Sequence, residues 1–133
     1  MKKSQKSHRL RSLLVEHCLT FSGAYEDYPF RDDTAALRHG SNRRIFALFL
    51  KHRERELLNL KSEPYNALFW RNQFPSVIPG YHMNKVHWNS VILDGTVPED
   101  AIKDMIAESF DLTKPKAGKR KNVPKLDVEW END

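Results

Sequence analysis

The chain has 133 residues, of which 39% are hydrophobic and 30% charged, with a formal net charge of +4 and a single cysteine. This is enough apolar material for one domain with one core, and a lone cysteine excludes an intrachain disulfide. The apolar runs fall short of the roughly 18 residues that a membrane span takes, and the basic start lacks a small-residue cleavage site, so we expect a cytoplasmic protein.

The positive charge is concentrated at the two ends of the chain. Residues 1–15 carry five basic and no acidic side chains, and residues 114–133 carry six basic and four acidic ones. Residues 16–113 carry 11 basic and 14 acidic side chains, a net charge of −3. A dedicated DNA-binding domain usually carries its basic patch on the fold, so this distribution argues against tight or sequence-specific binding of nucleic acid.

A first helix is predicted from about Ser7 to Thr20. Apolar side chains recur in this region at three- and four-residue spacing, which is typical of one helical face; they are Leu10, Leu13, Leu14, Cys18 and Phe21. We interpret Cys18 as a small buried hydrophobic side chain of this stripe rather than as a nucleophile.

Three strands are predicted next, over residues 34–39, 43–51 and 56–62. The GSN sequence at 40–42 predicts a hairpin turn, because Gly and Asn tolerate positive φ. The second strand is apolar on both faces, which favours a central position in a sheet. The third has Leu58 and Leu60 on one face and Asn59 and Lys61 on the other. The intervening HRERE sequence, residues 52–56, is predicted to be an exposed turn.

The second half of the chain predicts a helix over residues 62–74, a strand over 86–93 and a last helix that ends near 112. Ser62 is the expected cap of the second helix, and its expected apolar edge is Tyr65, Leu68 and Phe69. Thr96 and Glu99 have the spacing of a capping box, and the last helix carries an apolar stripe of Ile102, Met105, Ile106 and Phe110. After residue 113 the periodicity is lost, which predicts a charged, flexible tail over 114–133.

This order of elements predicts a single α+β domain over residues 1–113, including a basic N-terminal extension. Strands that follow one another through tight turns favour an antiparallel sheet, and helices at the start, middle and end can cover one face of it. The predicted architecture is therefore a two-layer sandwich of an antiparallel sheet and helices.

The sequence GYHMNKVHWNS, residues 80–90, gathers two histidines, a lysine and a tryptophan. One interpretation is a structural motif of Gly80, Tyr81, Asn84 and Trp88. In it Gly80 permits an unusual backbone angle, Asn84 bonds local backbone, and Trp88 enters the core with its indole N–H paired. The other interpretation is a surface for an anion, with His82, Lys85 and Asn89 as the candidates. Because no CxxC or HExxH spacing is present, we expect no metal site, and no cofactor is expected.

At these residues the chain resembles a known family. The segments GAYEDYPF, FALF, LNLKSEP, FPSVIPGYHMNKVHWNSVILDGTVPED and IKDMIAESFDL are similar, in order, to the MmcQ/YjbR family of small bacterial proteins, over residues 15–113. The resemblance implies a compact sandwich with an antiparallel sheet, similar to secretion-chaperone and frataxin-like architectures. It also implies a "double wing" DNA-binding protein, and it supplies no catalytic residues.

Three functions remain open from the sequence. The first hypothesis is a non-enzymatic, monomeric cytoplasmic protein that binds DNA weakly and without sequence preference. Its candidate phosphate contacts are Lys2, Lys3, Lys6, Arg9 and Arg11 near the start, Lys119, Arg120 and Lys121 in the tail, and Arg43, Arg44, Lys61 and Lys85 on the sheet. The alternative is an adaptor that binds a protein partner through a sheet face or groove. An enzyme acting on a small molecule is the third.

Overall fold

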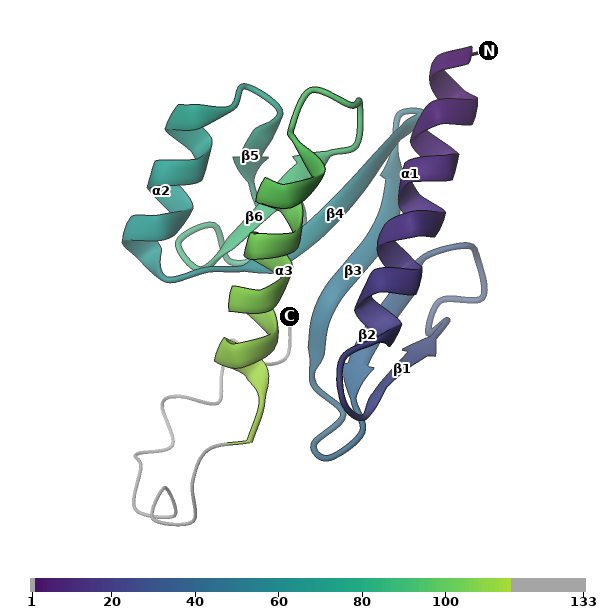
Figure 1. Ribbon diagram of the computed structural model, residues 1–133, viewed down its shortest axis with the longest axis vertical. Helices are drawn as coiled ribbons and strands as arrows, with labels where there is room; N and C mark the ends of the chain where they lie inside the picture. Colours follow the sequence, from purple (N-terminus) through teal and green to yellow (C-terminus); the bar gives the residue numbers. More distant parts are fainter. Residues whose placement is uncertain (1, 116–133) are drawn as a thin grey trace.

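The structure is a computed structural model that describes residues 2–115, with side chains described from residue 6 onward. Within this range the chain forms three helices and one antiparallel sheet of six strands (Figure 1). The helices are α1 (Lys2–Leu19), α2 (Pro64–Gln73) and α3 (Glu99–Thr113). The strands are β1 (Ala24–Asp27), β2 (Ala35–His39), β3 (Ile45–His52), β4 (Arg55–Lys61), β5 (Val77–Pro79) and β6 (Trp88–Ile92), in the sheet order β1-β2-β3-β4-β6-β5.

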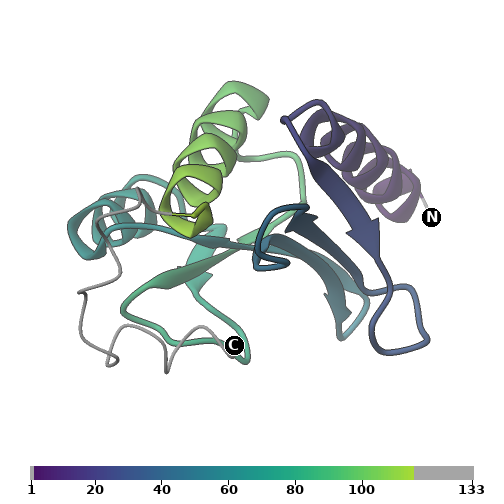
Figure 2. The same cartoon turned by 90° about the horizontal axis from the view of Figure 1, so that it is seen from below.

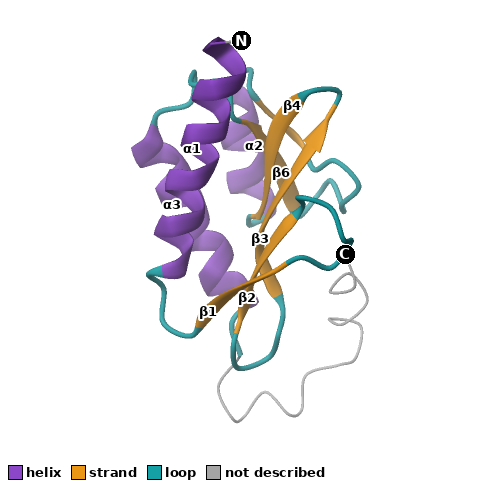
Figure 3. Cartoon of the chain, turned by 90° about the vertical axis from the view of Figure 1, so that its right-hand side faces the viewer, coloured by secondary structure: helices purple, strands orange, loops and turns teal. Residues whose placement is uncertain are grey.

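Sheet and helices form two layers. The three helices lie on one side of the sheet, as the view from below in Figure 2 and the side view in Figure 3 show. The main core lies between the layers, where α1 and α3 pack on the central strands. Its fully buried members include Leu14, Phe46, Phe49, Leu58, Ile102 and Ile106. The predicted α+β sandwich with an antiparallel sheet is confirmed.

The first helix begins earlier than predicted, at Lys2, and ends at Leu19. Two members of its predicted stripe, Leu14 and Cys18, are fully buried, whereas Leu13 is half exposed. Burial raises the pKa of the Cys18 thiol to about 12. The thiol therefore stays protonated at neutral pH, which agrees with its interpretation as a core side chain and removes it as a nucleophile.

Strand β1 was not predicted. It pairs antiparallel with β2, with Ala24 opposite His39, and its two middle residues, Tyr25 and Glu26, are exposed. An edge strand of this kind buries few side chains, so it leaves little apolar pattern in the sequence.

The predicted hairpin between β2 and β3 is present, but its expected backbone angles are wrong. The positive φ in this turn belongs to Arg43, at 66°, and not to Gly40 or Asn42. Gly40 is needed for a different reason: its N–H donates to the Gly23 carbonyl at 2.8 Å, and a Cβ at this position would lie 2.7 Å from the same oxygen. Close approach of two backbone segments, rather than positive φ, therefore requires this glycine.

The central position of β3 is confirmed, since residues 46–50 are all buried. The exposed turn predicted for residues 52–56 is shorter than expected. The turn itself is Arg53 and Glu54, both with positive φ, at 52° and 69°. Glu56 already belongs to β4 and is buried, because its carboxylate meets a buried arginine of α1.

The structure corrects two features of α2. The residue at its N-cap is Glu63, not Ser62, and no side chain caps the helix. Its predicted apolar edge faces outward: Tyr65 is 88% exposed, Leu68 52% and Phe69 51%. The helix packs instead through a second stripe at three- and four-residue spacing, which consists of buried Ala67 with partly buried Trp70 and Phe74. Both stripes fit a helix, so periodicity alone could not choose between them.

The stripe predicted for α3 is confirmed, with Ile102, Met105 and Ile106 buried. Its predicted capping box is wrong, because Pro98 occupies the N-cap without a side-chain bond. The Thr96 N–H donates instead to the Asp94 carboxylate at 3.0 Å, which closes the turn before the helix. Among residues 2–115, none of the helices combines the length and the apolar character that crossing a bilayer demands.

Candidate functional site

The loop between β5 and β6, residues 80–87, holds most of the sequence motif, and its first residue is fixed by packing. Gly80 is buried and donates its N–H to the Trp88 carbonyl at 2.9 Å. A Cβ on Gly80 would lie 2.8 Å from the Trp88 Cβ and 2.9 Å from the Trp88 oxygen. Gly80 has no positive φ, so the expected unusual backbone angle is wrong and close contact with Trp88 is the reason for the glycine.

The middle of this loop is a closed turn. The Asn84 side-chain oxygen accepts the N–H groups of Val86 at 2.9 Å and His87 at 3.2 Å, as predicted. The Lys85 ammonium donates back to the Gly80 carbonyl at 2.8 Å and the Met83 carbonyl at 3.3 Å. Lys85 is exposed, but its ammonium is already hydrogen-bonded to carbonyls of its own loop, which weakens it as an anion contact.

Tyr81 joins the loop to the sheet. Its N–H donates to the Ser90 hydroxyl at 2.8 Å, and its carbonyl accepts the Asn59 amide at 3.0 Å. Its ring contacts two imidazoles, with ring centroids 4.2 Å from His52 and 4.0 Å from His82. His82 itself is exposed and has a φ of 63°. It is the one predicted anion contact of this motif whose side chain is both exposed and uncommitted among the bonds described for the loop.

Asn89 is not on the surface, contrary to the sequence hypothesis. It is 1% exposed. Its side-chain N–H group donates to the Ala67 carbonyl of α2 at 3.1 Å, and its oxygen accepts from Arg71 Nε at 2.7 Å. Arg71 in turn donates to the Lys85 carbonyl. Asn89 therefore fastens α2 and the loop to β6, and its amide is not available to a ligand.

Trp88 is buried, as predicted, but its expected hydrogen bond is not formed. Within the described part of the chain, the Trp88 indole N–H and the Ser62 hydroxyl are buried without a hydrogen-bond partner. An unpaired buried donor lowers stability by about 1–3 kcal/mol. Trp88 thus serves the core through its apolar surface, and its polar edge adds nothing to the fold.

The basic candidates on the sheet do not form one surface. Lys61 is 3% exposed and Arg11 is buried, so both are wrong as phosphate contacts. Arg43 is exposed and Arg44 is half-buried at the β2–β3 turn. Lys6 and Arg9 are exposed on α1. Lys2 and Lys3 belong to α1 by their backbone, whereas Lys119, Arg120 and Lys121, with the tail from residue 116, lie outside the described residues.

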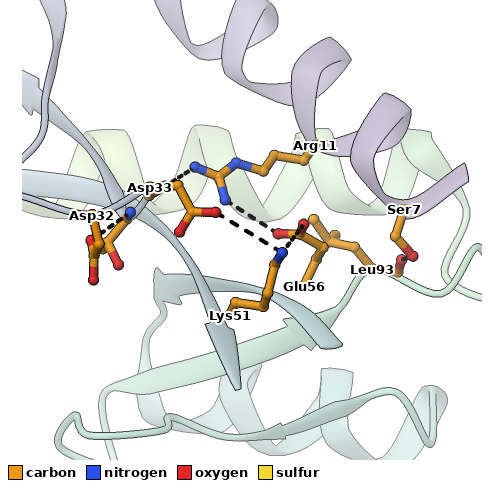
Figure 4. A network of polar contacts seen from close by, with 8 residues as sticks. Ser7, Arg11, Asp32, Asp33, Lys51, Glu56 and Leu93 are labelled. Carbon is orange, nitrogen blue, oxygen red and sulfur yellow. Dashed lines mark hydrogen bonds and ion pairs between the residues drawn. The ribbon is translucent and has the colours of Figure 1, made fainter. Parts of the chain in front are cut away.

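Sequence reasoning missed a polar network between α1 and the β3–β4 hairpin (Figure 4). Arg11 Nη1 lies 3.2 Å from Glu56 Oε1, and both side chains are about nine-tenths buried. Arg11 Nη2 also donates to the Asp33 carbonyl, and Lys51 Nζ lies 3.9 Å from Glu56 Oε2 and 4.0 Å from Asp33 Oδ2. The two partners of Arg11, Asp33 and Glu56, lie 22 and 45 residues away along the chain, so no local pattern could have revealed them.

A pocket of about 660 Å³ opens beside this network. It is lined by Ser7, His8, Arg9 and Ser12 of α1 and by Lys51, Glu54 and Glu56 of the hairpin. The charges of the lining are mixed, and the buried carboxylate on its wall is already paired with Arg11. Such a pocket can hold a small polar molecule. Within residues 2–115, no three His, Cys, Asp or Glu side chains gather closely enough to hold a metal ion.

Comparison with known proteins finds relatives that this chain covers over most of their length. The family model described as YjbR matches residues 19–112. The uncharacterized protein YyaQ of Bacillus subtilis is 36% identical over 116 residues, which cover 78% of this chain and 98% of YyaQ. The uncharacterized protein YjbR of Escherichia coli K12 is 30% identical over 99 residues, or 74% of this chain and 82% of its own.

Solved structures agree with the fold described above. A crystal structure of a Pseudomonas syringae protein has a TM-score of 0.70 at 28% identity and covers 78% of this chain and 98% of its own. A crystal structure of a Deinococcus radiodurans protein with the DUF419 domain has a TM-score of 0.69 at 31% identity and covers 90% of this chain and 85% of its own.

Proposed function

The chain belongs to the YjbR family, and on this premise we propose that it is a non-enzymatic cytoplasmic protein that binds DNA weakly and without sequence preference, through the basic first half of α1. The observation that carries this proposal is the early start of α1 at Lys2. The basic N-terminal residues are therefore part of a helix, whose first turns reach past the end of the sheet in Figure 1.

The exposed charges of α1 are suitably spaced for a phosphate backbone. Lys6 and Arg9 are both exposed and three residues apart, which places them on neighbouring positions of one helical face. Lys2 and Lys3 precede them in the same helix. Cationic side chains in a row bind phosphates by charge, without reading base edges, so the expected binding tolerates any sequence.

The folded body supports only a weak complex. Three of the candidate contacts that sequence reasoning assigned to the domain, Arg11, Lys61 and Asn89, are buried, and the Lys85 ammonium is bonded to backbone carbonyls. Few contacts remain on the described surface, and residues 16–113 carry a net charge of −3. The affinity should consequently fall steeply as salt rises.

The test is the salt dependence of binding to a fluorescent duplex, measured by anisotropy. Deletion of residues 1–11 is unsuitable, because it would also remove Arg11 from its buried pair with Glu56. We therefore compare Lys6→Ala/Arg9→Ala with the matched double variant Arg55→Ala/Lys103→Ala, which removes the same charge elsewhere. Each lost phosphate contact should reduce the slope of log affinity against log salt by about 0.9, so the α1 variant should lose about 1.8.

Two outcomes would contradict this proposal. Equal effects of the two double variants would mean that net charge, and not α1, sets the affinity. No binding by the intact protein even at low salt would remove DNA as the ligand altogether.

A second candidate, a protein-interaction adaptor, is favoured by the outward stripe of α2. Tyr65, Leu68 and Phe69 expose 88%, 52% and 51% of their surfaces on adjacent turns, and grouped exposed apolar side chains often mark an interaction site. A photo-crosslinking residue in place of Leu68 should then give one discrete adduct in cells, while the same residue in place of the exposed Asp104 of α3 should give none. A lack of adducts at both positions would speak against the adaptor.

A further inference from the structure

The pocket between α1 and the β3–β4 hairpin has two sides of opposite charge. Residues of α1 form one side, and residues of the hairpin form the other. The α1 side carries Arg9 and no acidic side chain, which gives it a charge of +1. The hairpin side carries two carboxylates, Glu54 and Glu56, and one ammonium, Lys51, which gives it a net charge of −1. A ligand with a positive charge at one end and a negative charge at the other matches this polarity.

On the hairpin side, one oxygen of a buried carboxylate lacks a hydrogen bond. Glu56 is 7% exposed, and its Oε1 accepts from Arg11 Nη1 at 3.2 Å. Its Oε2 lies 3.9 Å from Lys51 Nζ, an ammonium that is shared with the Asp33 carboxylate at 4.0 Å (Figure 4). These two distances are too long for hydrogen bonds, and among the described residues no group donates to Oε2. A buried carboxylate is stabilised by a further donor, which the pocket can admit.

The second carboxylate of the pocket is placed there by a strained turn. His52 is opposite Arg55 in the register of β3 and β4, so Arg53 and Glu54 are the two residues of the turn, with φ of 52° and 69°. Turns with two positive φ angles normally contain Asn and Gly, because a larger side chain is disfavoured in this conformation. In residues 6–115, the Glu54 carboxylate forms no hydrogen bond or ion pair. A strained residue with an unused charge at a pocket is typical of a functional position.

The α1 side supplies the donors that an anionic group needs. Arg9 and Ser12 are exposed and line the pocket, and within the described part of the chain neither side chain forms a hydrogen bond or ion pair. A guanidinium binds a carboxylate through two N–H groups, and the serine hydroxyl adds a third donor. Ser7, which also lines the pocket, is already engaged, since its hydroxyl donates to the Leu93 carbonyl at 2.7 Å. The two free donors therefore face the pocket from the α1 side.

We propose that this pocket binds a small zwitterion, a free amino acid or a short peptide. The ammonium group of the ligand donates to Glu56 Oε2 and to the Glu54 carboxylate, and its carboxylate accepts from Arg9 and Ser12. The volume of about 660 Å³ lies within the range of roughly 300–1,000 Å³ that small-molecule sites occupy, so the pocket has room for more than one amino acid residue. This binding goes beyond the proposed binding of DNA, which Arg9 also serves, so its test contains no nucleic acid.

The experiment is a titration of the isotope-labelled full-length protein, followed by NMR. The probes are L-alanine, dialanine and trialanine, which share an ammonium and a carboxylate end and differ in length. Saturable shifts are expected for the amide signals of residues 7–12 and 51–56 and not for those of α2. The probe that binds most tightly shows whether the ligand is an amino acid or a peptide. The N-acetylated and C-amidated forms of that probe, which lack one charged end each, should bind about tenfold less tightly.

Substitutions in the protein separate binding from stability. Glu54→Gln and Arg9→Ala should each weaken binding of the same probe about tenfold. The matched controls are Asp104→Asn and Arg55→Ala, at exposed positions that do not line the pocket, and they should leave the affinity unchanged. Glu54→Gly should weaken binding as Glu54→Gln does, while its thermal unfolding midpoint stays equal to that of the intact protein or rises, because glycine accepts the positive φ of the turn.

Either of two results would overturn the proposal. If none of the three probes causes saturable shifts, the pocket does not bind a small zwitterion. If the N-acetylated and C-amidated probes bind as tightly as the unmodified one, or if Glu54→Gln binds as tightly as Asp104→Asn, the charged ends of the ligand are not what the pocket recognises. Neither result depends on whether the protein binds DNA.

Discussion

Gly80 shows how a single residue determines the path of the 80–87 loop. Its missing side chain lets the chain pass against Trp88, where a Cβ would come within 2.8 to 2.9 Å of two atoms of the tryptophan. The bond from the Gly80 N–H to the Trp88 carbonyl depends on the same approach. The loop, the buried tryptophan and the bonds of Lys85 to the Gly80 and Met83 carbonyls therefore form one unit.

Gly80→Ala should destabilise the protein by about 1–3 kcal/mol, because it overpacks a filled site. Urea unfolding measures this change. Val86→Ala, at an exposed position of the same loop, is the control and should stay within about 0.5 kcal/mol. A Gly80→Ala protein as stable as the control would show that the loop can move away from Trp88.

His39 is a buried imidazole that should make stability depend on pH. Burial, followed by the nearby positive charge of Arg44, lowers the pKa of His39 from 6.5 to about 4, and Lys114 adds to this effect. The Thr113 hydroxyl donates to the Ser109 carbonyl at 2.7 Å, so its oxygen is left to accept the His39 Nε2–H at 2.7 Å. The neutral imidazole is therefore the form that the fold accommodates.

The unfolded chain binds a proton at His39 near pH 6.5, and the folded protein only near pH 4. The stabilisation by neutral His39 is complete above pH 6.5 and decreases as the pH falls toward 4. We expect the free energy of unfolding, measured in urea between pH 7.5 and 4, to fall less steeply in His39→Asn than in the intact protein. His82→Asn, at an exposed imidazole of the 80–87 loop, should keep the pH dependence of the intact protein. The same slope in His39→Asn and the intact protein would contradict this assignment.

At the level of elements, the buried pair of Arg11 and Glu56 joins α1 to β4. Removal of one partner leaves a buried charge unpaired, which typically lowers stability by about 3–5 kcal/mol. Glu56→Gln should approach this loss in urea unfolding, and Arg11→Met/Glu56→Leu should recover much of it. The surface pair of Lys103 and Glu99, 3.9 Å apart, supplies the control, since Lys103→Met should change stability by no more than about 1 kcal/mol. A double variant less stable than Glu56→Gln would mean that the pair orders α1 in a way that apolar side chains cannot.

Substitutions in the outward stripe of α2 and in the main core should have different effects on stability. Leu68→Ser/Phe69→Ser changes residues that are half exposed, so the unfolding free energy should change by about 1 kcal/mol at most. Leu60→Ala, in the main core, should lower it by about 2–5 kcal/mol. A large loss in the α2 variant would show that this stripe is covered in solution.

The elements also show what could be read from the sequence. The stripes of α1 and α3 were predictable, because each buries a regular pattern against the sheet. The central position of β3 was predictable, because both of its faces are apolar. The face that α2 presents to the sheet was not, since it is set by Asn89, which binds the Ala67 carbonyl from 22 residues away. In the candidate site, too, only the local features could be predicted. The Asn84 turn is local and was predicted, whereas the burial of Lys61 and Arg11 depends on partners from other elements.

At the scale of the whole molecule, one sheet separates two clusters of buried apolar side chains. The first is closed by α1 and α3. The second, smaller cluster lies on the side without helices and consists of Ala36, Leu48, Leu50, Leu57 and Ile92. The basic first turns of α1 lie in the helix layer and extend beyond the end of the sheet (Figure 3). The exposed apolar stripe of α2 and the basic turns of α1 lie on different helices, so charge-driven and apolar contacts can be tested separately.

The two outer strands of the sheet bear on how the protein behaves when it is concentrated. β1 carries Glu26 and Asp27 within its four residues, and β5 has three residues and ends in Pro79, which has no N–H to donate. Charge, shortness and proline are features that hinder a strand from another molecule from adding to a sheet. The sheet therefore resists growth from either border, so the molecule can expose the apolar stripe of α2 without aggregating through its sheet edges.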